Sequence, residues 1–188
     1  MDAFLPVLVA AAFAQFSDRA PMLAAVLSDR HAAPRRVLLA FAAAHLIGFA
    51  LAAGAGLIMA NVMTPEARRL ILGLAFLFGA FGMAWRQGRL DRLEGWRIGS
   101  IATAFLGAFI LAFGDRTQFL ALGFSAWSAS PVLPAIGATI GAMIPTTIAV
   151  MMGEAAWARL PHRGVRYGTA AVFALTGILL ALSAWGLI

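Results

Sequence analysis

Ala112-Phe113-Gly114-Asp115-Arg116-Thr117-Gln118 places an acid and a base side by side within a largely apolar run from Ile98 to Trp127. A charge in the hydrocarbon interior of a bilayer costs on the order of 3 kcal/mol unless it has a partner or water. Ionisable groups in such segments therefore usually have a function. We take this stretch as the feature around which the rest of the chain is organised.

The composition is that of a membrane protein. Hydrophobic residues make up 62% of the 188 residues and charged residues only 12%, whereas soluble domains are nearer to about half apolar and a quarter charged. The apolar runs are long and do not alternate, which argues against a transmembrane barrel. We therefore predict an all-α, polytopic membrane protein whose main partner is the lipid bilayer.

The charged and reactive residues limit the function classes. The net charge of +6 comes from arginines in short loops between apolar runs, where they orient a membrane protein, so we expect no nucleic-acid partner. The chain has no cysteine and no lysine, and its three histidines lie far apart in the sequence. Thiol and Schiff-base chemistry are thereby excluded, and we expect neither an enzyme nor a cofactor.

Six membrane spans are predicted, since a span needs roughly 20 apolar residues. Pro21 is expected to break the first span just after a charged pair. Residues 1–86 would form a first three-helix repeat, residues 87–97 a cytoplasmic linker, and residues 98–188 a second three-helix repeat. The predicted spans are Ala3–Leu27, Val37–Met63, Leu70–Trp85, Ile98–Trp127, Val132–Trp157 and Tyr167–Ile188.

The arginines predict the orientation in the membrane. Ten of them lie in the loops that follow spans 1, 3 and 5, and only Arg68 and Arg69 lie in the loops on the other side. Because cytoplasmic loops carry the excess of positive charge, the linker should be cytoplasmic and both termini non-cytoplasmic. The predicted location is the inner (plasma) membrane of a bacterium.

A weaker copy of the organising stretch lies near the N-terminus, as Gln15-Phe16-Ser17-Asp18-Arg19-Ala20-Pro21. At an offset of 97 residues, Asp18 aligns with Asp115 and Arg19 with Arg116. Each copy lies in the first span of its half. Because three spans is an odd number, the second half enters the membrane from the opposite side, which predicts a 3+3 inverted repeat of the kind found in secondary transporters.

The repeated motif supplies oxygen ligands suited to hard cations. Asp18 and Asp115 offer carboxylates, while Gln15 and Thr117 offer neutral oxygens, a set that favours Ca²⁺, Mn²⁺ or Mg²⁺. We predict that these four residues bind a metal ion as transported substrate. Five further residues are expected to line the site or to balance its charge: Ser17, Arg19, Gly114, Arg116 and Gln118.

The two arginines of the motif are expected to pair crosswise with the aspartates, Asp18 with Arg116 and Asp115 with Arg19. The aspartates could also bind protons, because desolvation favours the neutral acid whereas a nearby arginine favours the carboxylate. The sequence leaves both possibilities open. An ion pair that only holds two broken helices together is the structural alternative.

The motif resembles that of the transmembrane protein 165 family (uncharacterised protein family 0016), which comprises membrane transporters of calcium and manganese. The family pattern is Glu-x-Gly-Asp-(Lys/Arg)-Thr, once in each three-helix half, and the resemblance extends over nearly the whole chain. The second motif keeps Gly114, Asp115, Arg116 and Thr117, and Gln118 is also usual there, whereas the first keeps only the Asp-Arg pair. The resemblance implies a secondary transporter that exchanges Mn²⁺ or Ca²⁺ for protons by alternating access.

Two departures from the family pattern bear on the substrate. Gln15 and Ala112 stand where the family has glutamates, so two carboxylates remain where four would be usual, and divalent affinity should fall. One alternative is an exporter of a small organic or amino-acid solute with the same architecture, because arginine can clamp a carboxylate. Another is a non-transporting membrane protein with a degenerate site.

Two other ionisable residues receive structural interpretations. His45 is expected to be a hydrogen-bonded packing residue, with a proton relay as the alternative. Glu154 is expected to be solvated at the cytoplasmic interface.

Overall fold

A computed structural model describes residues 3–85 and 88–187, and these residues form helices joined by short loops. The predicted all-α class is confirmed. The helices are α1 (Phe4–Phe16), α2 (Arg19–His31), α3 (Pro34–Ala60), α4 (Pro65–Ala84), α5 (Ser100–Ala112), α6 (Arg116–Ser128), α7 (Val132–Met152), α8 (Glu154–Ala158) and α9 (His162–Ala184).

Four helices in the described part of the chain, α3, α4, α7 and α9, are long and apolar enough to cross a membrane. A fifth span is possible if α5 and α6 are taken together, although they meet at a bend of 67°. The chain is therefore an integral membrane protein with four or five candidate spans among the residues described. The prediction of six spans is not confirmed, because the first predicted span is divided between α1 and α2.

The division of the first predicted span has a local cause. Asp18 occupies the N-cap of α2 and accepts a hydrogen bond from the backbone N–H of Arg19. This leaves α1 with 13 residues, or about 20 Å, which is shorter than a hydrocarbon core of roughly 30 Å. Pro21 was wrongly expected to end a helix: it lies in the first turn of α2, where its missing N–H would have no partner within the helix.

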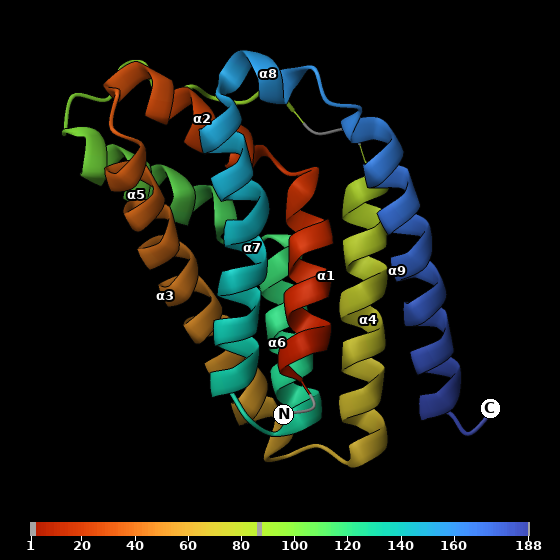
Figure 1. Ribbon diagram of the computed structural model, residues 1–188. Coiled ribbons are helices and arrows are strands. Elements are labelled where there is room, and N and C mark those ends of the chain that lie inside the picture. The colour runs from red at the N-terminus through yellow and green to blue at the C-terminus, as the bar shows by residue number, and fades with distance from the viewer. Residues whose placement is uncertain (1–2, 86–87, 188) are drawn as a thin grey trace.

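Helices from the two halves of the chain pack against each other throughout. α1 packs on α7, α3 packs on α5 and α6, and α4 lies beside α9. α2 and α5 lie obliquely at the end of the molecule that also carries α8 (Figure 1). These contacts between the halves bring the two interrupted segments close together.

Small residues allow the closest of these contacts. A Cβ atom on Gly73 would lie 3.0 Å from the carbonyl oxygen of Gly177, where α4 meets α9. A Cβ on Gly141 of α7 would overlap the carbonyl oxygen of Leu8 in α1. Glycine is therefore required at these crossings, as in many packed membrane helices.

The loops divide between the two ends of the molecule as the arginine distribution predicts. The start of α1 and the end of α9 lie at one end, with the loops before α4 and before α7 (Figure 1). The start of α3, residues 88–99 and the α8–α9 connection lie at the opposite end, which we call the arginine-rich end. Ion sites near this end would be reached from the side that carries the positive loops.

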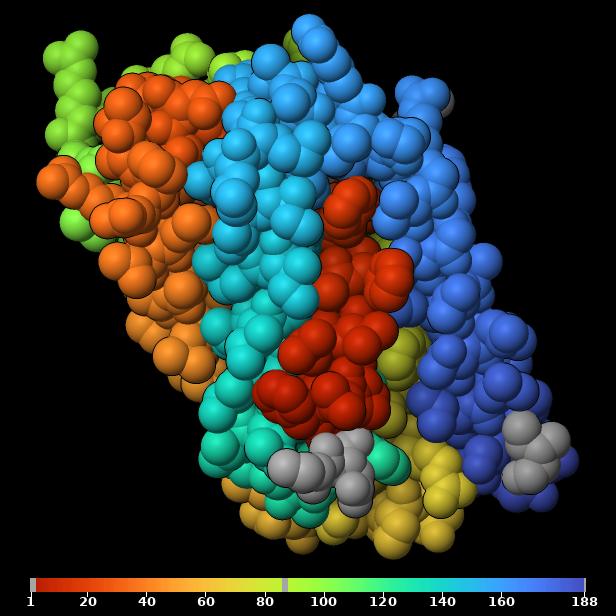
Figure 2. Space-filling view, in the orientation of Figure 1, coloured from red at the N-terminus to blue at the C-terminus, as the bar shows by residue number. Residues whose placement is uncertain are grey.

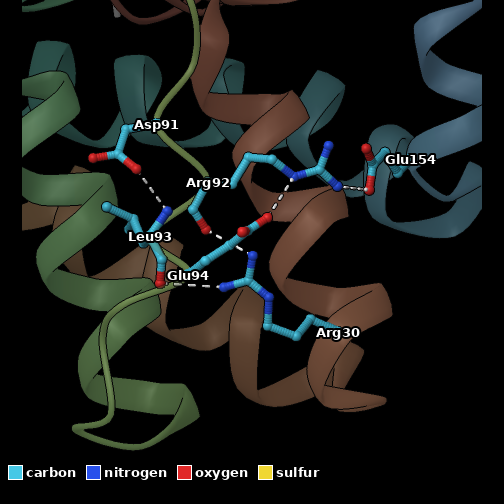
Figure 3. Close-up of polar contacts among 6 residues, drawn as sticks. All are labelled: Arg30, Asp91, Arg92, Leu93, Glu94 and Glu154. Atoms are coloured by element: carbon cyan, nitrogen blue, oxygen red, sulfur yellow. Dashed lines mark hydrogen bonds and ion pairs between the residues drawn. The ribbon is translucent and has the colours of Figure 1, made fainter.

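Residues 88–99 contain no helix and are held at the arginine-rich end by contacts to both halves (Figure 3). Arg30 donates hydrogen bonds to the carbonyl oxygens of Arg92 (2.8 Å) and Leu93 (3.3 Å), while the Arg92 guanidinium pairs with Glu154 at 2.7 Å. Glu154 is thus in an ion pair with its side chain 27% exposed, rather than simply solvated as expected. Residues 86 and 87 lie outside the described residues, so the boundary of the first repeat at residue 86 stays a prediction.

Candidate ion site at the two helix breaks

The first break lies between α1 and α2. α1 ends at Phe16, and Ser17 leaves the helical path so that Asp18 starts α2. The buried Ser17 hydroxyl has no hydrogen-bond partner among the described residues. The aspartate and the arginine of the first motif therefore lie at the beginning of a helix, where the backbone N–H groups are free to bind negative charge.

The second break, between α5 and α6, has the same position in its motif but a different backbone. Gly114 has a φ of +73°, in the left-handed region that favours glycine. Its N–H donates to the side-chain oxygen of Gln118 at 2.9 Å. Asp115 then takes the N-cap position of α6, but its side chain makes no cap hydrogen bond. In both halves, the motif aspartate immediately precedes the second helix of the broken pair.

Two buried contacts join the breaks. Arg116 Nη2 lies 2.7 Å from Asp18 Oδ2, and the two side chains are only 6% and 11% exposed. The Thr117 hydroxyl donates to Gln15 Oε1 at 3.0 Å. The predicted crosswise pair of Asp18 with Arg116 is present, but the described residues show no ion pair between Asp115 and Arg19.

Both aspartates line one cavity of about 480 Å³. Arg19, Arg116 and Gly114 also line it, and α4 closes one side with Phe81, Gly82 and Trp85. Arg116 additionally donates to the Gly82 carbonyl oxygen at 3.4 Å. The two acids and the two bases of the repeated motif thus line the same cavity.

The other predicted site residues lie around this cavity but do not line it. Gln15 and Thr117 are buried and bond to each other. Gln118 holds the Gly114 N–H, and Ser17 lines a neighbouring cavity that also includes Asp18 and Arg19. Among the described residues that line the shared cavity, the side-chain oxygens are therefore those of the two carboxylates.

The described residues contain no group of three or more His, Cys, Asp or Glu side chains placed to hold a metal ion. Gln15 and Ala112 stand at the two positions where the motif resemblance implies glutamates. One of the two carboxylates, Asp18, is also engaged by Arg116. A divalent ion in this cavity would have to compete with an arginine that the protein itself supplies.

His45 was not given a role in the predicted site, and its environment differs from the one expected. It is 1% exposed, and neither ring nitrogen has a hydrogen-bond partner among the described residues. Its ring stacks on Phe49 with centroids 5.4 Å apart and contacts the edge of Phe41. The prediction of a hydrogen-bonded residue was wrong, since aromatic packing surrounds the imidazole instead.

Comparison with known proteins identifies the family. The sequence profile described as "Divalent cation/proton antiporter GDT1" matches the chain twice, over residues 3–90 and 100–187. The chain belongs to this GDT1 family. The resemblance of the motif to a family of cation transporters is thereby confirmed, and the separate matches correspond to the two motif-bearing halves.

A curated relative supports the same assignment. A Vibrio cholerae serotype O1 protein described as "Putative manganese exporter" is 27% identical over 172 residues, which are 90% of this chain and 86% of the relative. No solved structure matches the chain significantly. Since the GDT1 family comprises cation/proton antiporters, the chain is a membrane transporter of cations and not an enzyme.

Proposed function

We propose that this chain exchanges Mn²⁺ for protons across the inner membrane of a bacterium, with Asp18 and Asp115 as the residues that bind the ion. The observation that carries the proposal is the single cavity lined by both aspartates. The description of the Vibrio relative favours Mn²⁺, and Ca²⁺ is the other ion suited to hard oxygen ligands. Gln15 and Thr117 would supply additional oxygens once their mutual hydrogen bond opens.

The packing of the helices supports an inverted repeat of two three-helix halves. Each half has a broken pair followed by two long helices, and α1 packs on α7 as α5 packs on α3. Two contacts break this correspondence: α4 packs on α6 and α9 on α1, with no comparable contact of α9 with α2 or of α4 with α5. Alternating access would exchange these contacts, moving the α4–α9 pair toward α2 and α5. The arginine distribution supports non-cytoplasmic termini.

The charges at the cavity suggest how cation and proton are coupled. With both carboxylates ionised, Asp18 and Asp115 balance Arg19 and Arg116, so a bare divalent ion would add two uncompensated charges. We infer that Arg116 leaves Asp18 when the ion binds and returns when it departs. With Arg116 back on Asp18, a proton on Asp115 would leave neither carboxylate as an isolated charge during the return step, where such a charge is costly.

Ion flux in proteoliposomes tests the proposal. Wild-type protein in vesicles with an imposed proton gradient should transport Mn²⁺. Asp115→Asn should reduce the initial rate of Mn²⁺ transport at least tenfold, because one of the two anionic ligands is lost. Asp91→Asn, on the exposed linker, removes the same charge from a residue that does not line the cavity and should transport normally.

Equal Mn²⁺ flux in wild type and Asp115→Asn would exclude the assigned role of this carboxylate. A thermal-stability screen separates the remaining alternatives. Stabilisation by small carboxylate solutes but not by Mn²⁺ or Ca²⁺ would favour an organic-solute exporter, since the cavity also presents two arginines. A protein that binds none of these and tolerates alanine at both aspartates would have a degenerate site.

A further inference from the structure

A second cavity of about 280 Å³ lies beside the first at the arginine-rich end. Three arginines line it: Arg19 from the start of α2, and Arg163 and Arg166 from the first turns of α9. The one carboxylate in its lining belongs to Asp18, which already faces Arg116 at 2.7 Å. The cavity therefore has a strong excess of positive charge, and its contents should be anionic.

The arginines of this basic cavity have N–H donors that are not used within the described residues. The Nε atoms of Arg19 and Arg166 are buried and have no partner among the described residues. Arg166 donates to the Tyr167 hydroxyl at 3.0 Å, and its guanidinium lies over the Tyr167 ring at 4.9 Å, while Arg163 is exposed. Guanidinium groups bind phosphate through paired, charge-assisted hydrogen bonds, so a phosphate group fits the chemistry of this space.

An apolar groove of about 680 Å³ lies next to the basic cavity, between α1, α4 and α9. Figure 2 shows this face, with α1 in red and α9 in blue on either side of the groove. Its lining runs from Val165 to Thr176 along α9, a rise of about 16 Å. That length matches one leaflet, about half of a hydrocarbon core of roughly 30 Å.

The groove and the basic cavity follow one another along two segments of the chain. On α9, Arg166 lines the cavity and Thr169, three residues later, lines the groove. Phe13 of α1 lines the groove, and Ser17, directly after the end of α1, lines the cavity. Each change takes about one helical turn, or 5.4 Å. An anionic group and an apolar tail joined at that spacing would fill both spaces at once.

We propose that an acidic phospholipid binds here, with its phosphate at Arg163 and Arg166 and one acyl chain along the groove between α1 and α9. Basic pockets between membrane helices on the side of the positive loops are suited to such headgroups. A free phosphate would satisfy the arginines but would leave the groove unexplained. Because Arg19 lines both cavities, the lipid phosphate would lie next to the arginine that faces the ion-binding aspartates. The lipid site does not depend on the proposed transport.

Lipid occupancy tests the proposal on the full chain purified in mild detergent. Native mass spectrometry with equimolar dioleoylphosphatidylglycerol and dioleoylphosphatidylcholine should show at least fivefold more of the acidic lipid bound. The double variant Arg163→Gln, Arg166→Gln should abolish this preference. The matched control Arg35→Gln, Arg36→Gln removes the same charge from exposed positions at the same end of the molecule and should keep it.

The groove is tested separately with glycines on α9. Gly168 lines the groove and Gly164 does not, and a Cβ atom at either position would meet no other atom within 4 Å. Gly168→Leu should therefore fill the groove and lower occupancy by both lipids at least threefold without impairing folding. Gly164→Leu should leave occupancy unchanged.

Three outcomes would overturn the lipid site. The first is an unchanged preference for the acidic lipid in the Arg163, Arg166 double variant. The second is equal occupancy in Gly168→Leu and Gly164→Leu. The third is displacement of the lipid by 10 mM inorganic phosphate or glycerol 3-phosphate, which would assign the basic cavity to a soluble phosphate compound instead.

Discussion

The two helix breaks carry the same Asp-Arg pair but use it differently. At the first break, the Asp18 carboxylate faces Arg116 from the other half of the chain. At the second, Asp115 lines the shared cavity, and the described residues show no ion pair between it and Arg19. Of the two expected crosswise pairs, the described residues show Asp18 with Arg116 but not Asp115 with Arg19.

This difference separates two roles that the sequence assigns to both aspartates. Asp18 pairs with an arginine of the other half in this conformation, whereas Asp115 lines the cavity beside residues of its own motif. Two copies of the same Asp-Arg pair can therefore have different partners in one conformation. Substitutions that affect one break and spare the other test this asymmetry.

The largest effect is expected from Asp18→Asn. It removes the carboxylate that faces the 8%-exposed Arg116, and loss of one partner of a buried ion pair costs about 3 kcal/mol. The free energy of unfolding, measured by denaturant titration in mixed micelles, should fall by about this amount. Arg92→Gln breaks the more exposed pair with Glu154 and should cost less than about 1 kcal/mol. Similar losses in both variants would show that the buried pair has no special structural role.

Thr117→Val should have the next largest effect. It removes the hydroxyl that donates to Gln15 and leaves a buried amide oxygen without this donor, at a cost of about 1 to 3 kcal/mol. Thr103→Val is the matched control, because the Thr103 hydroxyl is equally buried but has no partner among the described residues. Thermal unfolding of both variants measures the difference. If Thr103→Val proves the more damaging, the contact between the breaks does not stabilise this conformation.

Gln15→Glu tests whether the first break contributes to ion binding. It restores one carboxylate of the family pattern at the first break, and the Thr117 hydroxyl can still donate to the new side chain. Because the charge of the ligands tunes divalent affinity, we expect the dissociation constant for Mn²⁺ to fall about tenfold, or 1.4 kcal/mol. Isothermal titration calorimetry provides the measurement. Unchanged affinity would place position 15 outside the ion site.

Gly114→Ala should have the smallest effect on stability. The residue has a φ of +73°, and a Cβ atom there would have open space around it, so the cost is that of the backbone alone, about 1 kcal/mol. Ser17→Ala, at the corresponding break with a φ of −102°, should cost almost nothing. A shift in melting temperature for the first variant only would confirm that the second break depends on its glycine.

The sequence located both breaks because a charged pair inside an apolar run is a strong signal. It also predicted the pair of Asp18 with Arg116, since an acid and a base at mid-membrane need partners. It could not predict that Asp115 and Arg19 stay apart, because their separation depends on how the two broken pairs of helices pack, including the 67° bend between α5 and α6.

Two other errors have local physical causes. Proline was expected to end the first helix, but a capping aspartate three residues earlier ended it instead, and Pro21 then fitted the first turn of α2. His45 was expected to find a hydrogen-bond partner because buried polar groups usually do. The aromatic rings of Phe41 and Phe49 occupy its surroundings instead, an arrangement that only the packed structure could show.

The interleaving of the two halves has a consequence for how the protein is made. α1 packs mainly on α7, yet Val132, the first residue of α7, is synthesised more than a hundred residues after Phe16 ends α1. Until then, the alanine-rich face of α1 has no native neighbour, and contacts between distant segments form late and slowly. If synthesis stalled before α7, α1 would remain without its main packing partner. The packing of α1 can therefore be completed only after α7 has been synthesised.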